Sequence, residues 1–195
     1  MGTGGNSRPD GEGSGNDTII FCIIFFFVSQ TVIEVFDKDK LVKKKVCLIK
    51  EGDLVQTYNG NSKALTKVIK IVKNKGTFEF YEFKCRCRDN ASNEKSISVT
   101  GNHTMIIFGK QKDEVKFKNA SQVKVGDLLR TTEGIFEIFE INKKNMEECF
   151  EIRTEDGTVL ANDILVSTLY LEKNVNEKKY QKILDLSKIP IEILN

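Results

Sequence analysis

The sequence IKEGDLVQT at residues 49–57 returns with small changes as VKVGDLLRT at residues 123–131. In both copies a run of alternating apolar and polar side chains follows, at residues 68–72 and 135–139. A repeat of roughly seventy residues is too long for the stacked units of a solenoid. The sequence therefore predicts one domain built from two similar halves. We expect the halves to bring their matching turns to one place, which is where chemistry is to be sought.

The pattern between residue 31 and about residue 170 is typical of strands. Apolar and polar residues alternate there, and turn-forming residues separate the runs at 58–61, 132–134 and 155–157. Many short strands without intervening helices indicate an all-β fold of barrel-like or sandwich-like type. The tail at 173–195 has apolar residues spaced among charges, which predicts one short C-terminal helix.

Composition sets limits on the function. The 195 residues are 39% hydrophobic and 30% charged, as in a globular domain, and the net charge of +2 gives no reason to expect a nucleic-acid partner. Cys85 and Cys87 share one face of a predicted strand, but the chain has a single histidine, His103, so we expect no metal and no cofactor. Cys47 is expected as a small buried side chain, and the domain as a monomer.

The N-terminal region divides into two segments. Residues 1–17 are rich in glycine, serine and asparagine, which predicts a disordered leader. The segment 18–30 begins with an apolar run at 18–28 that is too short for an ordinary transmembrane helix. Three interpretations stay open for it: a signal or anchor remnant, a buried strand, or sequence foreign to the mature protein. Localisation is therefore open, with secretion or membrane association through 18–28 favoured over the cytoplasm.

The chemistry-bearing candidate is the tetrad Thr100-Gly101-Asn102-His103, which lies between two predicted strands. A hydroxyl and an imidazole three residues apart across a tight turn can converge on one peptide bond. The imidazole, with a pKa near neutrality, can donate to the amide nitrogen or exchange its proton. The counterpart of this turn in the second half is Asn162-Asp163, for which a turn role and an orienting contact in the site are both open.

Three blocks together resemble the Hint domain, the fold shared by inteins and the autoprocessing half of Hedgehog proteins. They are residues 100–103, 117–129 and 155–170. The sequence of the last block is closest to the Hedgehog type. The resemblance covers about residues 35–170, within a domain assigned to 31–172. It implies a pseudo-twofold all-β horseshoe.

The resemblance also implies an activity. In the family a cysteine attacks the preceding carbonyl, converting a peptide to a thioester by an N-to-S acyl shift, and the thioester is then resolved. The substrate is the chain's own N-terminal precursor segment, and water or another small nucleophile is the acceptor. By this resemblance Thr100 would polarise the scissile bond and His103 would protonate the departing amine.

The chain departs from the family pattern at both ends. Val35 stands where the family's opening frame places the nucleophilic cysteine, and Cys22 is too far upstream to replace it. Ser167-Thr168 occupy the place of the closing His-Asn of inteins, so splicing is not expected. The family resemblance therefore implies self-cleavage, silenced if valine is the native residue. The alternative is a non-catalytic secreted or membrane-tethered β-domain used for binding or structure.

Overall fold

The computed structural model describes residues 26–59, 62–109 and 115–169, which form strands, turns and two 3₁₀ turns. The strands are, in chain order, β1 (Val32–Asp37), β2 (Lys40–Lys45), β3 (Leu54–Asn59), β4 (Ser62–Cys87), β5 (Glu94–Thr100), β6 (Thr104–Phe108), β7 (Val115–Asn119), β8 (Leu128–Thr131), β9 (Gly134–Thr154), β10 (Thr158–Ala161) and β11 (Ile164–Ser167). The 3₁₀ turns are η1 (Val46–Leu48) and η2 (Ala120–Gln122). The all-β prediction is confirmed. In the part of the chain that the structure describes, no helix has the length and apolar character needed to cross a membrane.

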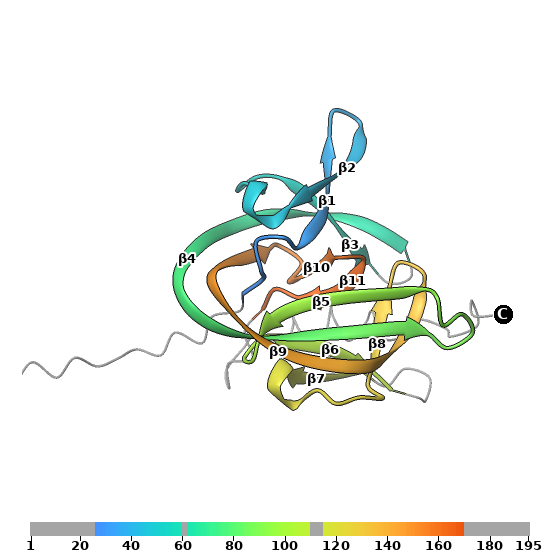
Figure 1. The fold of residues 1–195 in the computed structure, drawn as a ribbon. Coiled ribbons are helices and arrows are strands. Elements are labelled where there is room, and N and C mark those ends of the chain that lie inside the picture. The colour runs from blue at the N-terminus through green and yellow to red at the C-terminus, as the bar shows by residue number, and fades with distance from the viewer. Residues whose placement is uncertain (1–25, 60–61, 110–114, 170–195) are drawn as a thin grey trace, which may run out of the picture.

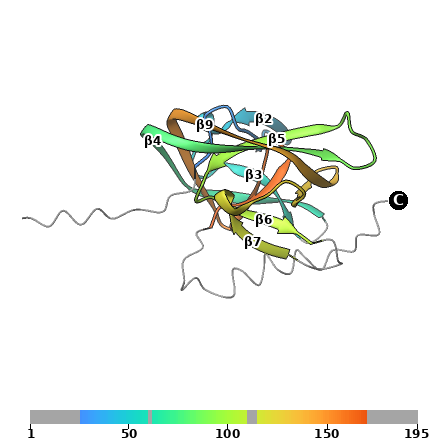
Figure 2. The same ribbon diagram turned by 60° about the horizontal axis from the view of Figure 1, so that its bottom comes forward.

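The strands belong to one sheet that closes on itself. Nine of them lie in the order β11-β10-β1-β3-β4-β9-β8-β6-β7, and β11 also pairs with β8. The other two lie off this path, β2 beside β1 and β5 beside β4. Figure 1 shows the long strands β4 and β9 curving around the shorter β10 and β11. The view in Figure 2 shows β6 and β7 as neighbouring strands on the side away from β4 and β9. The outline is the predicted horseshoe.

The two halves use their elements in the same order. In the first half the hairpin β1–β2 leads through η1 to β3 and the long β4. In the second half the hairpin β6–β7 leads through η2 to β8 and the long β9. The duplication read from the sequence is therefore a duplication of strand pairing.

The long strands β4 and β9 join the halves. They run antiparallel, with Val68 opposite Thr154 at one end and Cys87 opposite Phe136 at the other. Their register shifts at three places, and such β-bulges bend and twist a strand. Gly76, next to one of these shifts, has φ +147°, which glycine adopts at little cost. The bulged pair can therefore curl around the core.

The repeated Gly-Asp turns have matching geometry. Gly52 N–H donates to the Val68 carbonyl and Gly126 N–H to the Ile138 carbonyl, both at 2.8 Å. Both glycines have φ +91°, a conformation that L side chains rarely adopt. Each turn thus anchors its half to the start of its long strand.

The aspartates of these turns bind backbone N–H groups. Asp53 Oδ2 accepts from Lys50 N–H at 3.0 Å, and Asp127 Oδ2 accepts from Lys124 N–H at 2.9 Å. Asp127 also forms an ion pair with Lys118 at 2.8 Å. These contacts give the two aspartates a role in holding the turns.

Three of the cysteines belong to the core or pack against it. Cys85 and Cys149 are buried among apolar side chains of β4 and β9, and Cys87 packs partly buried against the same core. Cys47 was expected inside, and this prediction is wrong, because it lies in the η1 turn with its side chain exposed.

The apolar run at 18–28 enters the described part of the chain only with its last three residues. Phe26, Phe27 and Val28 are buried in the sheet. The rest of the run, the predicted leader at 1–17 and the predicted helix within 173–195 lie outside the described residues.

If the two Gly-Asp turns are equivalent, the same substitution should cost the same in each. We expect Gly52→Ala and Gly126→Ala each to lower the free energy of unfolding by about 1 to 2 kcal/mol, the cost of a left-handed conformation for an L side chain. Backbone strain is the main cost, since a Cβ at Gly52 meets nothing within 4 Å and one at Gly126 meets only Glu137 Oε1 at 3.9 Å. Urea denaturation measures both, with the exposed Val125→Ala as the control. Values near that control would contradict the expectation.

Candidate functional site

The predicted tetrad forms the turn between β5 and β6. His103 N–H donates to the Thr100 carbonyl at 2.9 Å, which closes the turn. Ala120 N–H donates to the His103 carbonyl at 2.8 Å and ties the turn to η2. Thr100 is 7% exposed and His103 is fully buried. The turn therefore holds both side chains inside the domain, against the strands that surround it.

The segment at residues 26–28 lies directly beside this turn. Phe26 N–H donates to Thr100 Oγ1 at 3.2 Å, and Thr100 N–H donates to the Phe26 carbonyl at 3.2 Å. Phe27 exchanges two backbone hydrogen bonds of 2.9 Å with Phe150 of β9. The segment is thus clamped between the end of β5 and β9.

The Phe26 side chain is held as firmly as its backbone. It is buried in a cluster with Val28, Phe80 and Cys149, and its ring meets the Phe78 ring edge-on at 5.2 Å. Such burial of an aromatic ring stabilises its position by roughly 2 to 3 kcal/mol. Backbone and side chain together set which peptide bond faces Thr100.

His103 is a neutral imidazole in this arrangement. Its ring meets the Phe27 ring edge-on at 4.9 Å. Burial lowers the pKa of His103 from its usual 6.5 to about 3, and a hydrogen bond with the Ser167 backbone opposes the shift in part. The expectation of a pKa near neutrality is therefore wrong, because desolvation disfavours the charged ring.

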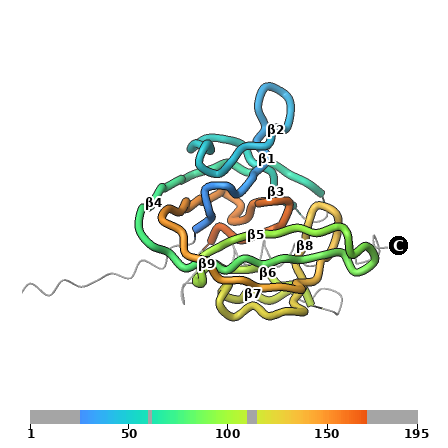
Figure 3. Tube along the Cα trace, in the orientation of Figure 1, coloured from blue at the N-terminus to red at the C-terminus, as the bar shows by residue number. Residues whose placement is uncertain are grey.

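The other end of the described chain reaches the same place. Ser167 ends β11 and contacts His103 through its backbone. Thr168 N–H donates to the Gly157 carbonyl at 2.8 Å, and its hydroxyl shares a 2.9 Å hydrogen bond with Thr154. In Figure 3 the blue start and the red end of the described trace both lie inside the curve of β4 and β9. Ser167, which stands with Thr168 in the place of the closing His-Asn of inteins, thus lies next to His103.

Val35 is not part of this site. It lies in the middle of β1, fully enclosed, opposite Val42 and Val55. The backbone that Thr100 binds belongs to Phe26, nine positions earlier in the chain. Thr100 therefore contacts the backbone of Phe26 and not that of Val35. The opening pattern of the family matches the sequence of strand β1, whereas the contact with Thr100 is made before that strand begins.

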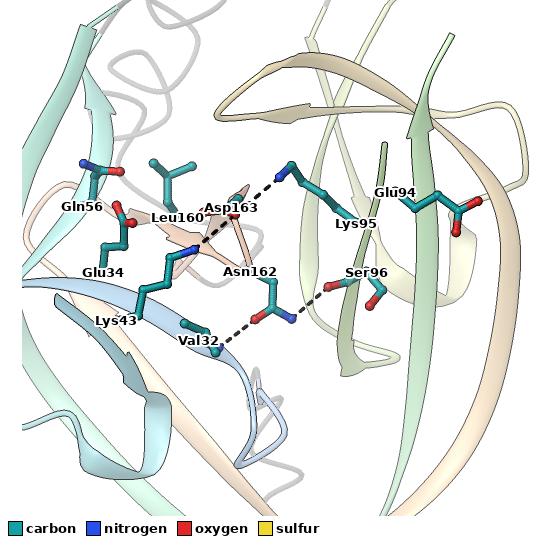
Figure 4. A pocket seen from close by; sticks show the side chains of 10 residues that line it. All are labelled: Val32, Glu34, Lys43, Gln56, Glu94, Lys95, Ser96, Leu160, Asn162 and Asp163. Atoms are coloured by element: carbon teal, nitrogen blue, oxygen red, sulfur yellow. Dashed lines mark hydrogen bonds and ion pairs between the residues drawn. The ribbon is translucent and has the colours of Figure 1, made fainter. Parts of the chain in front are cut away.

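The counterpart turn of Asn162 and Asp163 has other partners. Asn162 Oδ1 accepts from Val32 N–H at 2.7 Å, and its amide donates to the Ser96 carbonyl at 2.8 Å. Asp163 pairs with Lys95 at 3.4 Å and Lys43 at 3.8 Å (Figure 4). Both residues have positive φ, of 50° and 65°. These contacts support a turn role, and they hold β1, β2 and β5 together.

Two contributors to the site were missed at the level of sequence. Phe26 and Phe27 supply the bound backbone and the ring that covers His103. The only signal for them was the apolar run at 18–28, for which a buried strand was one of three interpretations.

No profile of a known protein family and no curated protein matches the sequence. Several solved structures are similar to this one. The gp41-1 intein is 22% identical with a TM-score of 0.55, over 73% of this chain and 98% of that one. A DnaB intein from Synechocystis sp. PCC 6803 is 18% identical (TM-score 0.57; 73% and 97% covered). A bacterial intein-like domain from Clostridium thermocellum is 20% identical (TM-score 0.56; 73% and 97% covered).

Similarity at these identities concerns the fold. It agrees with the duplicated topology and the horseshoe of β4 and β9, so this chain has the Hint fold. The three structures are of intein type, and the closeness to the Hedgehog type stays a prediction.

The buried imidazole makes stability depend on pH. Because the folded pKa of His103 is about 3 and the unfolded value is 6.5, the unfolded chain alone takes up a proton as the pH falls below 6.5. Stability is therefore complete above that pH and lost toward the folded value. Between about pH 6.5 and 5, where His103 is the only histidine to titrate, we expect the free energy of unfolding to fall by ~1.5 kcal/mol.

Urea denaturation at a series of pH values checks this expectation. His103→Gln is the comparison variant, since glutamine keeps hydrogen-bonding groups and does not titrate. The loss over this pH range should disappear in the variant. Equal pH dependence in both proteins would show that the imidazole is not responsible.

Proposed function

We propose that the chain is a Hint-type autoprocessing domain that acts on the peptide bond between Phe25 and Phe26, and that phenylalanine at position 26 keeps the site silent. One observation carries the proposal: the Phe26 N–H, which belongs to that bond, donates to Thr100 Oγ1 beside the His103 turn. The substrate is the chain's own N-terminal segment. The intein-type fold of the similar structures supports this class of reaction.

The chemistry follows from this contact. With a thiol at position 26, sulfur would attack the carbonyl carbon of residue 25 and the carbon–nitrogen bond would break. The nitrogen must gain one proton as it leaves, and the thiol must lose one. Neutral His103 has a lone pair to accept the proton of the thiol and can pass it to the departing nitrogen, while Thr100 holds that nitrogen in place. Water then hydrolyses the thioester and restores the thiol.

Cleavage without ligation is the proposed outcome. Ligation in inteins depends on the closing His-Asn pair, and this chain has Ser167-Thr168 there. The Thr168 hydroxyl is engaged with Thr154, and its side chain carries no amide that could cyclise. Water or another small nucleophile is therefore the acceptor.

A second candidate function is a non-catalytic β-domain. It is favoured by the packing of Phe26 among Phe78, Phe80 and Cys149, and by the Phe27 ring over His103. These contacts close the site and stabilise the fold. In that case the segment at residues 26–28 has only a structural role.

Restoring a thiol at the bound position separates the two functions. We expect Phe26→Cys to cleave between residues 25 and 26, faster with dithiothreitol or hydroxylamine, because both attack thioesters. Intact-mass spectrometry of the full chain gives the cleavage position. Adding His103→Ala should slow cleavage by at least ~100-fold, a typical loss for an acid–base group.

Two controls make the result specific. Phe26→Ala removes the same ring without adding a thiol, and should stay intact. Val35→Cys puts a thiol in the centre of β1, away from the Thr100 contact, and should also stay intact. If folded Phe26→Cys is not cleaved, or if Val35→Cys is cleaved instead, the proposed site is wrong.

A further inference from the structure

Four exposed apolar side chains lie together on one face of the sheet, across β2, β1, β3 and the start of β4. Phe36 of β1 stands directly opposite Leu41 of β2 and directly opposite Leu54 of β3. Residues directly opposite each other on antiparallel strands have their side chains on the same face, close enough to interact. Leu65 shares this face, because it lies two positions along β4 from Lys67, which is opposite Leu54. We call these four apolar residues the apolar row.

The apolar row is open to solvent. Its side chains are between 39% and 43% exposed, and they are four of the seven large apolar side chains that are exposed in the described part of the chain. Single exposed apolar side chains are common, but a group of neighbouring ones marks a surface that binds something. Figure 1 shows the hairpin β1–β2 projecting from the rest of the sheet, which places this end of the row at the periphery of the domain. The proposed cleavage makes no use of these residues.

Lysines flank the apolar row. Lys43 follows it on β2, and Lys63 and Lys67 lie beside it on β4, all on the same face by strand alternation. Lys43 stands opposite Glu34 on the hairpin and lies 3.8 Å from Asp163, so its charge is largely balanced. Lys63 and Lys67 are exposed and form no ion pair with any residue that the structure describes. Their charges are therefore available to an external anion.

The whole region around the row is positive. Residues 32–70 hold nine lysines and five carboxylates, a surplus of four positive charges, whereas the net charge of the complete chain is only +2. Of the carboxylates on the hairpin, Asp37 pairs with Lys44 at 3.3 Å on the face opposite the row, and Asp39 lies in the turn. The positive charge of the chain is thus concentrated where its exposed apolar side chains gather.

We propose that the apolar row and its lysines bind the surface of an anionic lipid bilayer. The apolar side chains enter the boundary between head groups and acyl chains, and the lysines pair with anionic head groups. A lysine stem lies along apolar surface while its ammonium group stays among the head groups, so the two kinds of contact support each other.

Charge and strand pairing disfavour two other occupants. A second copy of this chain, seated on the same face, would bring one set of lysines against another, and like charges repel. A peptide added as a strand would pair with the outer edge of β2, which among the described strands pairs only with β1. Lysines at 43, 44 and 45 protect that edge against strand addition. An anionic bilayer meets neither obstacle.

Co-sedimentation of the full chain with lipid vesicles tests the proposal. We expect binding to vesicles of phosphatidylcholine with phosphatidylserine, and binding about tenfold weaker to phosphatidylcholine alone. Added sodium chloride should weaken the binding, because it screens the lysines. Absence of binding to the phosphatidylserine vesicles would overturn the proposal and leave the apolar row to a protein partner.

A matched pair of double variants locates the contact. Leu54→Gln with Lys67→Gln removes one apolar side chain of the row and the lysine opposite it, and should weaken binding to the phosphatidylserine vesicles by about tenfold or more. Lys124→Gln with Val125→Gln makes the same two changes at exposed residues of the second Gly-Asp turn and should leave binding unchanged. Equal binding by the first variant and the wild type would place the membrane contact elsewhere, such as the apolar run at 18–28, and would overturn the proposal.

Fluorescence gives a readout that does not depend on those variants. The chain has no tryptophan, so a single introduced one reports only on its own surroundings. With the phosphatidylserine vesicles, the emission of Leu41→Trp should shift to shorter wavelength and be quenched by brominated lipid, whereas Val125→Trp should show neither effect. Vesicle binding without a shift in Leu41→Trp would show that the apolar row does not enter the bilayer.

Discussion

The antiparallel pairing of β4 with β9 is the constraint on which the rest of the structure depends. It joins the two halves along almost the whole length of both strands, from Val68 opposite Thr154 to Cys87 opposite Phe136. Its bulges make the pair curve, and the curve brings residues far apart in sequence into contact. Phe26 reaches Thr100 across 74 residues because the segment at 26–28 lies between β5 and β9, where Phe27 bridges Val99 and Phe150. Without that pairing each half has its turns but no common site.

The candidate site shows a conflict between burial and proton chemistry. Phe27 covers His103 and binds β9, which stabilises the segment at 26–28. The same cover removes water from the imidazole and lowers its pKa to about 3. A neutral ring can pass a proton but does not store one at neutral pH. The site thus holds the Phe26 N–H through Thr100, beside a buried imidazole that is neutral.

The duplication places two similar turns in two different environments. His103 sits on one turn beside the Phe27 ring, whereas Asp163 sits on the other between two lysines. The repeat sets the backbone geometry of each turn, but the strands that pass nearby set the surroundings of its side chains. Of the two roles left open for Asn162-Asp163, their contacts therefore support the turn role. One turn binds the backbone of Phe26, whereas the other pairs with Lys43 and Lys95.

The sequence by itself determined the all-β class, the two halves and the local turns, because strand alternation and the Gly-Asp hydrogen bonds act over a few residues. It also placed Thr100 and His103 on one tight turn. Only the tertiary structure decided that Phe26, and not Val35, meets that turn, since the contact depends on the curvature of β4 and β9. It likewise decided the charge state of His103, because desolvation by Phe27 comes from packing, which no local pattern records.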